Sequence, residues 1–133
     1  QAPVWNSDRP ERGVTGEGPV GSRLLGRWRL FRYEIRRWRD GVLPDRAHAV
    51  DSPRRLGDSP VLARSVLDLV PEVPVLTWGR DELHTGEMWN SNSVIAWLLT
   101  RSGFDASGIS APAGGRAPGW GAGVAAASSA PEP

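Results

Sequence analysis

The chain of 133 residues contains no cysteine. Within these residues, that absence excludes disulfides, thiolate metal ligands and a cysteine nucleophile. Lysine is absent too, so all sixteen basic residues are arginines. Together with abundant Ala, Gly, Pro and Val, this bias is typical of a GC-rich coding sequence and does not indicate selection for phosphate binding. The formal net charge of +1 argues against the chain as a whole being a polyanion binder.

Long apolar runs are also missing. The longest strictly apolar run, Val94 to Leu99, is roughly a third of the length that a membrane span requires. No charged segment followed by an apolar one opens the chain, as it would in a secretory signal. We therefore expect a cytoplasmic protein without a membrane span. The chain begins with Gln1 and not with Met, so we expect it to be processed or to be a piece of a longer protein.

Composition divides the chain into three parts. Residues 1–26 are rich in Gly, Pro and charge and show little periodicity, so we expect an irregular N-terminal segment. Residues 27–104 carry regular hydrophobic patterns and are expected to form a single domain. Residues 105–133 are mostly Ala, Gly, Ser and Pro, and such a stretch buries too little apolar surface to offset its ordering entropy. We expect this tail to be irregular and mobile, apart from possible docking by Trp120.

A strand is predicted over Arg29 to Arg37. The side chains alternate there between apolar and charged: Phe31, Tyr33 and Ile35 against Arg32, Glu34 and Arg36. A period of two is typical of a half-buried strand. Asp40-Gly41 follows and suits a tight hairpin turn, because Gly tolerates positive φ. We therefore predict an antiparallel hairpin centred on Asp40-Gly41.

Two helices are predicted. Ser59-Pro60 is typical of an N-cap and a first helical residue, which places a helix at 60–70 that Pro71 ends. A second helix is predicted at 91–101, with Gly103 as its stop. The residues expected to face the core are Val61, Leu62, Ser65, Val66 and Leu69 in the first helix and Val94, Ile95, Leu98 and Leu99 in the second. The fold class predicted is α+β, with both helices packed on one face of a small antiparallel sheet.

The most informative stretch is the polar tetrad Asn90-Ser91-Asn92-Ser93, which leads directly into the second helix. A helix N-terminus offers unpaired N–H groups and a partial positive charge, which suit a cap, an anion site or an activated nucleophile. Ser91 is either a nucleophile or an ordinary N-cap. Asn90 and Asn92 either line an oxyanion site or satisfy backbone groups in the turn.

The tetrad, followed by a helix that continues Trp97-Leu98-Leu99, resembles the Asn-Cys-Asn-Thr/Ser-Phe motif of papain-like hydrolases and acyltransferases of the NlpC and lecithin:retinol-acyltransferase types. The preceding aromatic strand and the helix ending in Leu-Val-Pro are also similar. A bacterial group with no assigned activity is more similar still, because it shares a Met-Trp-Asn-Ser-Asn-Ser helix start and a Gly-Gly-Arg-Ala-Pro-Gly-Trp tail. The resemblance covers about Arg27 to Trp120. It implies a nucleophile at the head of a helix packed on a small antiparallel sheet, with a His on a strand as its base.

The chain departs from that family at the nucleophile. Ser91 stands where the family has Cys, and a serine hydroxyl is a far weaker nucleophile at neutral pH than a thiol. The available bases are His48, which Asp51 could orient, and His84, unless the family's His lies upstream of Gln1. We therefore expect a papain-like domain that is catalytically incomplete and uses no cofactor, with a small acyl or amide compound as the candidate substrate. The alternative enzyme is a serine-dependent hydrolase that uses Ser91 and His48.

A second alternative is an interaction module. Residues 23–39 hold seven Arg against one Glu, interleaved with aromatic residues, which is the composition of a surface that binds phosphates and stacks on bases. Arg32 and Arg36 would then bind nucleic acid or an acidic partner. We do not expect nucleic acid, because the alternation already assigns these charges to the solvated face of the strand. Trp89 is expected in the core or at its rim, with ligand stacking as the alternative. The acidic residues near His84 are too few for a metal site, and none is predicted.

Overall fold

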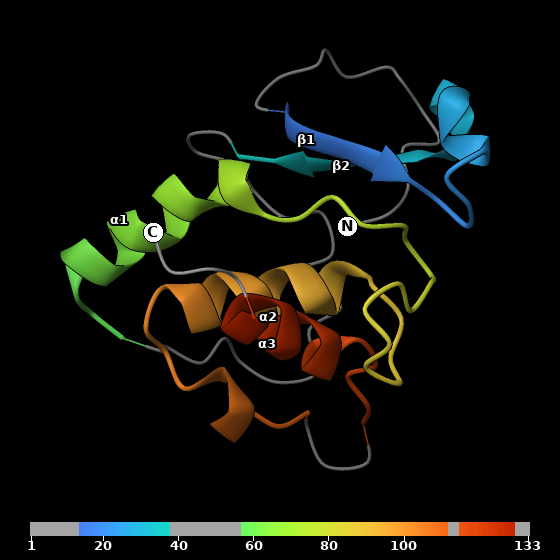
Figure 1. Cartoon of the computed structure of the whole chain (residues 1–133). Coiled ribbons are helices and arrows are strands. Elements are labelled where there is room, and N and C mark those ends of the chain that lie inside the picture. Colours follow the sequence, from blue (N-terminus) through green and yellow to red (C-terminus); the bar gives the residue numbers. More distant parts are fainter. Residues whose placement is uncertain (1–13, 38–56, 112–114, 130–133) are drawn as a thin grey trace.

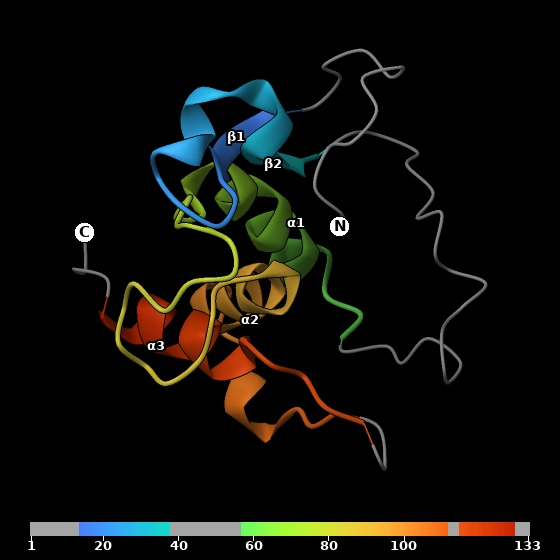
Figure 2. The ribbon, with the colours of Figure 1, turned by 90° about the vertical axis from the view of Figure 1, so that its right-hand side faces the viewer.

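The computed structural model describes residues 14–37, 57–111 and 115–129. Its regular elements are two antiparallel strands and three α-helices: β1 (Val14–Pro19), β2 (Arg32–Arg36), α1 (Pro60–Leu69), α2 (Ser91–Arg101) and α3 (Trp120–Ser129). Short 3₁₀ turns connect them: η1 (Leu25–Arg27), η2 (Arg29–Phe31), η4 (Val70–Glu72) and η5 (Ala106–Gly108). The sheet lies on one side of the molecule and α2 and α3 on the other (Figures 1 and 2). The predicted α+β class is confirmed.

The strand predicted from alternation is confirmed as β2, although the first predicted residues form the η2 turn instead. Tyr33 and Ile35 are buried, as the alternation predicts. Glu34, expected outside, is buried as well, where it forms an ion pair with Arg36. The return arm predicted after Asp40-Gly41 lies outside the described residues.

The partner of β2 is β1, so the expectation of an irregular segment is wrong for these residues. Gly18 pairs with Tyr33 and Gly16 with Ile35. A Cβ atom on Gly18 would lie 2.6 Å from the Tyr33 ring, and one on Gly16 would lie 3.0 Å from Val75 Cγ1. The aromatic ring and the valine occupy the space that β1 side chains would fill. The sequence of β1 therefore shows no apolar alternation that could have revealed a strand.

Tyr33 is the only tyrosine of the chain and is 1% exposed. Its hydroxyl donates to the Leu76 carbonyl at 2.5 Å, and its ring lies 5.2 Å from the Trp78 ring. Burial raises the pKa of Tyr33 to about 12, because the phenolate would lose its hydration.

This raised pKa makes the fold sensitive to alkali. Because the folded-state pKa lies above the unfolded value of about 10, the stability due to neutral Tyr33 is complete below pH ~10 and is lost as the pH rises toward 12. We expect tyrosinate absorbance to titrate near 12 in the native chain and near 10 in denaturant. A native midpoint near 10 would show that the phenol is hydrated and the core around it open.

The two predicted helices are confirmed, but one residue in each that was expected to face the core is exposed. Ser59 caps α1, and its Oγ accepts the N–H of Leu62 at 3.4 Å. Val61, however, is 75% exposed, because it lies one position away from the half-buried stripe of Leu62, Val66 and Leu69. In α2, Ile95 is 46% exposed, and the buried apolar residues are Val94, Ala96, Trp97, Leu98 and Leu99. Ala96 is buried because a third helix covers its side of α2.

That third helix, α3, lies in the tail that was expected to be irregular, so this expectation is wrong for residues 120–129. The residues that it buries are small: Ala122, Gly123, Ala126 and Ala127. A Cβ atom on Gly123 would lie 2.1 Å from the Ser93 carbonyl oxygen and 2.8 Å from Ala96 Cβ. The two helix backbones therefore approach closely, and this contact replaces the large apolar side chains that the tail does not have.

Trp120 docks as anticipated, and its indole N–H donates to the Ala106 carbonyl at 2.8 Å. The core between the layers includes Tyr33, Ile35, Val70, Val73, Trp89, Val94, Trp97 and Leu98, closed on one side by the alanines of α3. In the part of the chain that the structure describes, no helix has both the length and the apolar character needed to cross a bilayer.

Candidate functional site

Asn90, and not Ser91, caps helix α2. The Asn90 Oδ1 atom accepts the N–H groups of Asn92 at 2.9 Å and Ser93 at 3.3 Å. In return, the Asn90 N–H donates to Ser93 Oγ at 3.0 Å, which completes a capping box. Ser91 is the first helical residue. The interpretation of Ser91 as the N-cap is therefore wrong, because the longer asparagine side chain one position earlier reaches both N–H groups.

The capping box uses the groups that would stabilise an oxyanion. At a helix start, catalytic stabilisation needs N–H groups that point at an incoming ligand. Here the N–H groups of Asn92 and Ser93 donate to Asn90 Oδ1, and that of Val94 donates to the Asn90 carbonyl at 3.2 Å. The first turn of α2 is therefore largely satisfied by its own cap.

The remaining polar atoms of the tetrad hold the start of α3. The side-chain amides of Asn90 and Asn92 both donate to the Pro118 carbonyl, at 2.8 and 3.0 Å. The Ser93 hydroxyl donates to the Gly119 carbonyl at 2.7 Å, and Ser93 is fully buried. We call these five residues, Asn90, Asn92, Ser93, Pro118 and Gly119, the clasp. They place the N-termini of α2 and α3 side by side.

Gly119 is required in the clasp for two reasons. Its φ of +89° lies in the left-handed region, which residues with a side chain rarely adopt. In addition, a Cβ atom there would lie 2.4 Å from Asn90 Oδ1 and 2.8 Å from the Met88 carbonyl oxygen. The tetrad and the Pro-Gly-Trp sequence of the tail, which the sequence presents as separate features, thus form one structural unit.

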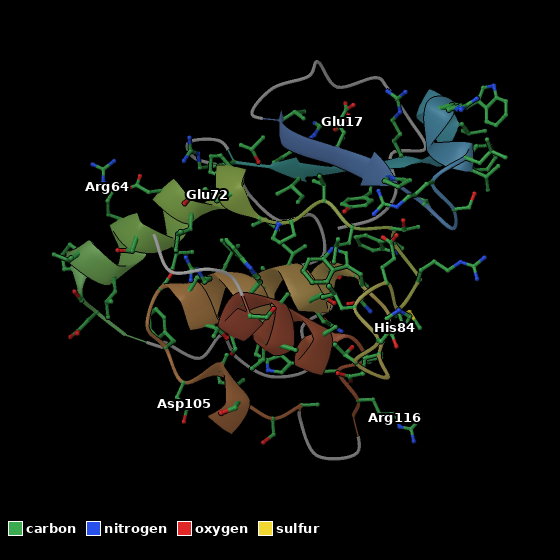
Figure 3. The ribbon with its side chains drawn as sticks, viewed as in Figure 1. Glu17, Arg64, Glu72, His84, Asp105 and Arg116 are labelled. Atoms are coloured by element: carbon green, nitrogen blue, oxygen red, sulfur yellow. The ribbon has the colours of Figure 1, made fainter. Side chains whose placement is uncertain are left out.

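The other predicted catalytic and stacking residues are His48, Trp89 and His84. His48 lies outside the described residues, so its pairing with Ser91 stays a prediction. Trp89 is buried in the core, where its backbone bonds to Gly79 and Arg80, so its ring has no open face for a ligand. His84 is exposed on the loop of residues 81–87 (Figure 3). Within the described ranges, no group of three His, Asp or Glu side chains could hold a metal ion.

The carboxylates near His84 build this loop. Asp81 accepts the N–H groups of Thr85 and Gly86, both at 2.8 Å, and these bonds lower the pKa of Asp81. Glu82 accepts the Thr77 N–H at 2.6 Å and the Arg23 Nε at 2.8 Å, and the Thr77 bond is the main cause of its lowered pKa. Both groups are therefore ionised at neutral pH and cannot serve there as general acids. Their stabilising effect is present above their ordinary pKa values and is lost in acid.

The two arginines proposed for nucleic-acid binding are used inside the fold. Arg32 donates to the carbonyls of Gly26 and Arg27, at 2.6 and 3.2 Å, and lies 3.7 Å from a Glu17 carboxylate oxygen. Arg36 forms its ion pair with the buried Glu34. These contacts do not favour the interpretation of β2 as a phosphate-binding strand.

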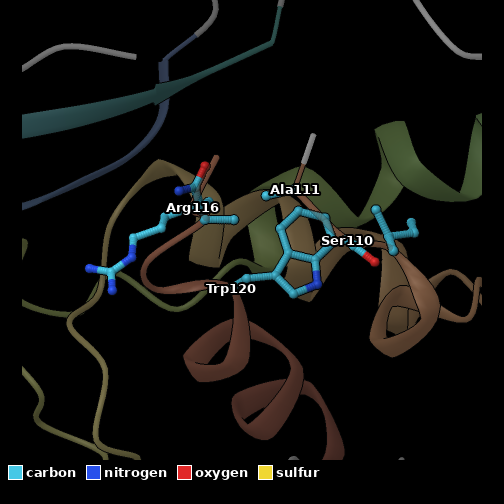
Figure 4. Close-up of a pocket in the computed structure, with 7 residues that line it drawn as sticks. Ser110, Ala111, Arg116 and Trp120 are labelled. Atoms are coloured by element: carbon cyan, nitrogen blue, oxygen red, sulfur yellow. The ribbon is translucent and has the colours of Figure 1, made fainter. Parts of the chain in front are cut away.

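A shallow hollow of about 280 Å³ lies next to the clasp. Figure 4 shows the Trp120 indole at its centre, Ser110 on one side, and Arg116 on the other with its guanidinium pointing away. Asn92 lines this hollow and Ser91 does not. Among the lining residues, Asn92 belongs to the tetrad and Arg116, Ala117 and Trp120 belong to the tail motif, whereas no local pattern marks Ile109, Ser110 or Ala111. The hollow could hold a small apolar group against the indole, but the predicted nucleophile does not face it.

A comparison of the chain with protein-family models, curated proteins and solved structures finds no match. The function must therefore be inferred from the site itself. That site is a helix start at which the side chains of Asn90, Asn92 and Ser93 are bonded within the protein, beside one half-buried serine, Ser91.

Proposed function

We propose that this chain is a papain-like domain that does not hydrolyse substrates by itself, and that the helix start bearing the nucleophile in that superfamily serves here as a structural clasp. The observation that carries the proposal is the bonding of Asn90, Asn92 and Ser93 to the residues before α3. The polar tetrad at the head of α2 and the antiparallel sheet of the fold agree with the resemblance.

The chemistry of acyl transfer explains why this helix start does not favour activity. A hydrolase of this type needs a readily ionised nucleophile, a base within about 3 Å of it, and donors aimed at the developing oxyanion. Ser91 is not a thiol, and the N–H groups of Asn92 and Ser93 already donate to Asn90. Even with a nucleophile at position 91, the N–H groups of the next two residues would remain bonded to the cap instead of pointing at the tetrahedral intermediate.

The substitution Ser91→Cys tests this proposal, because the parent chain has no thiol and the introduced one is the only thiol of the variant. We expect the introduced thiol to have a pKa somewhat below the ordinary value of about 8.5, since it would sit at a helix N-terminus. We also expect neither the parent nor the variant to turn over activated esters or amides faster than a control variant, Ser110→Cys, whose exposed thiol lies outside any helix. The rate of alkylation against pH gives each thiol pKa, and product absorbance gives the turnover.

The serine-hydrolase alternative makes the opposite prediction. Turnover by the parent chain that is lost in both Ser91→Ala and His48→Ala, with folding unchanged, would overturn the proposal. Turnover by Ser91→Cys well above that of Ser110→Cys would show that oxyanion donors are available after all.

A further inference from the structure

The short segment between β1 and β2 presents an unusual surface. Residues 22–31, which we call the tip, form the turns η1 and η2 at one end of the sheet, away from α2 and α3 (Figures 1 and 2). Three of its large apolar side chains are exposed to solvent: Leu24 by 60%, Trp28 by 56% and Leu30 by 54%. These three residues lie within seven positions of one another, and exposed large apolar residues gathered in this way are typical of an interaction site.

Hydrogen bonds within the tip hold much of its backbone. Four N–H groups donate to carbonyls within the two turns: Gly26 to Ser22, Arg27 to Leu24, Trp28 to Leu25 and Phe31 to Trp28. The Ser22 hydroxyl accepts the Leu25 N–H at 3.1 Å, and the Arg32 guanidinium donates to two tip carbonyls. These bonds reduce the number of backbone polar groups that would lose water if the tip entered an apolar environment.

Arginines accompany the apolar side chains in the sequence of the tip. Residues 22–32 contain four arginines and no acidic residue, although Glu82 pairs with Arg23 and Glu17 lies near Arg32. Arg23 is largely exposed and reaches Glu82, and Arg27 is exposed as well. The tip thus combines exposed leucine and tryptophan with arginine, the combination found where proteins contact the interface of an anionic bilayer.

We propose that the tip binds the surface of an anionic lipid bilayer. Leu24, Trp28 and Leu30 enter the interfacial region, and the exposed arginines contact the headgroups. Lipid fits better than nucleic acid, because the two leucines have no face for base stacking and Arg32 is bonded to the tip itself. Tryptophan suits the interface because its ring is apolar and its N–H is polar.

The test uses the full chain with vesicles of phosphatidylcholine alone or mixed with phosphatidylserine. We expect cosedimentation with the mixed vesicles that weakens as salt rises. Trp28→Ala and Leu24→Ser should each weaken binding about tenfold, because each removes an inserted side chain. Val61→Ser is the matched control, since Val61 is exposed on α1, far from the tip in sequence, and it should bind as the parent does. Circular dichroism and thermal melting show that each variant folds.

The proposal fails if the parent does not bind mixed vesicles, or if Val61→Ser loses binding as strongly as the tip variants. It also fails if Trp28→Ala abolishes binding to single-stranded oligonucleotides or formation of a dimer while vesicle binding is unchanged. If a tip variant does not fold, the proposal is tested on the parent with vesicles that contain brominated lipid. Quenching of tryptophan fluorescence is expected, and its absence overturns the proposal.

Discussion

Replacing Gly123 with Ala should destabilise the protein by about 2–3 kcal/mol, although alanine is the better helix former. The ideal Cβ position lies 2.1 Å from the Ser93 carbonyl oxygen and 2.8 Å from Ala96 Cβ. Neither the α2 backbone nor the fully buried Ala96 can move without separating the two helices. The cost is therefore the loss of close packing between α2 and α3. Urea denaturation followed by circular dichroism measures it.

Gly121→Ala is the matched control, because it makes the same change two residues earlier in the same helix. The Cβ atom there would meet Glu87 Oε2 at 2.1 Å, and that oxygen ends a side chain that can rotate away. We expect stability equal to that of the parent or up to about 1 kcal/mol higher, from helix propensity. Equal effects of the two substitutions would contradict close packing at Gly123.

Replacing Ser93 with Ala should lower the free energy of unfolding by about 2–4 kcal/mol. The hydroxyl is fully buried, donates to the Gly119 carbonyl at 2.7 Å and accepts the Asn90 N–H at 3.0 Å. Its removal leaves two backbone groups without this partner and breaks the capping box. The broken capping box weakens the start of α2, and the lost bond to Gly119 weakens the start of α3.

Ser91→Ala is the control for this change. Ser91 is half-buried, and neither the capping box nor the clasp uses its hydroxyl. We expect its loss to change stability by no more than about 0.5 kcal/mol. Denaturation of both variants under the same conditions gives the comparison. A larger effect at Ser91 than at Ser93 would mean that the tetrad is held together differently.

The elements that could be predicted from the sequence are those with local signals. Ser59-Pro60 marks the start of α1, the polar tetrad marks the start of α2, and the alternation around Tyr33 marks β2. In each case the pattern and the chemistry of the cap or strand lie within a few residues. Packing between elements determines the features that local signals do not predict, such as the exposure of Ile95.

β1 and α3 could not be predicted, because partners far away in sequence stabilise them. Gly18 leaves space for the Tyr33 ring, and Gly123 leaves space for the α2 backbone. In both elements a glycine makes the close contact. A residue without a side chain contributes nothing to a hydrophobic pattern, so the sequence gives no sign of the element. The same limit applies to the site, since the tetrad was recognised as a helix start while its partners, Pro118 and Gly119, lie in a segment expected to be mobile.

Hydrogen exchange of the α3 amides is the most direct test of the clasp. The parent, Ser93→Ala and Ser91→Ala would be compared by mass spectrometry of the peptide that covers residues 120–129. We expect this peptide to exchange much faster in Ser93→Ala than in the parent, because the buried bond from Ser93 to the Gly119 carbonyl is lost, and at the parent rate in Ser91→Ala. Unchanged protection of α3 in Ser93→Ala would contradict the structural role of the tetrad.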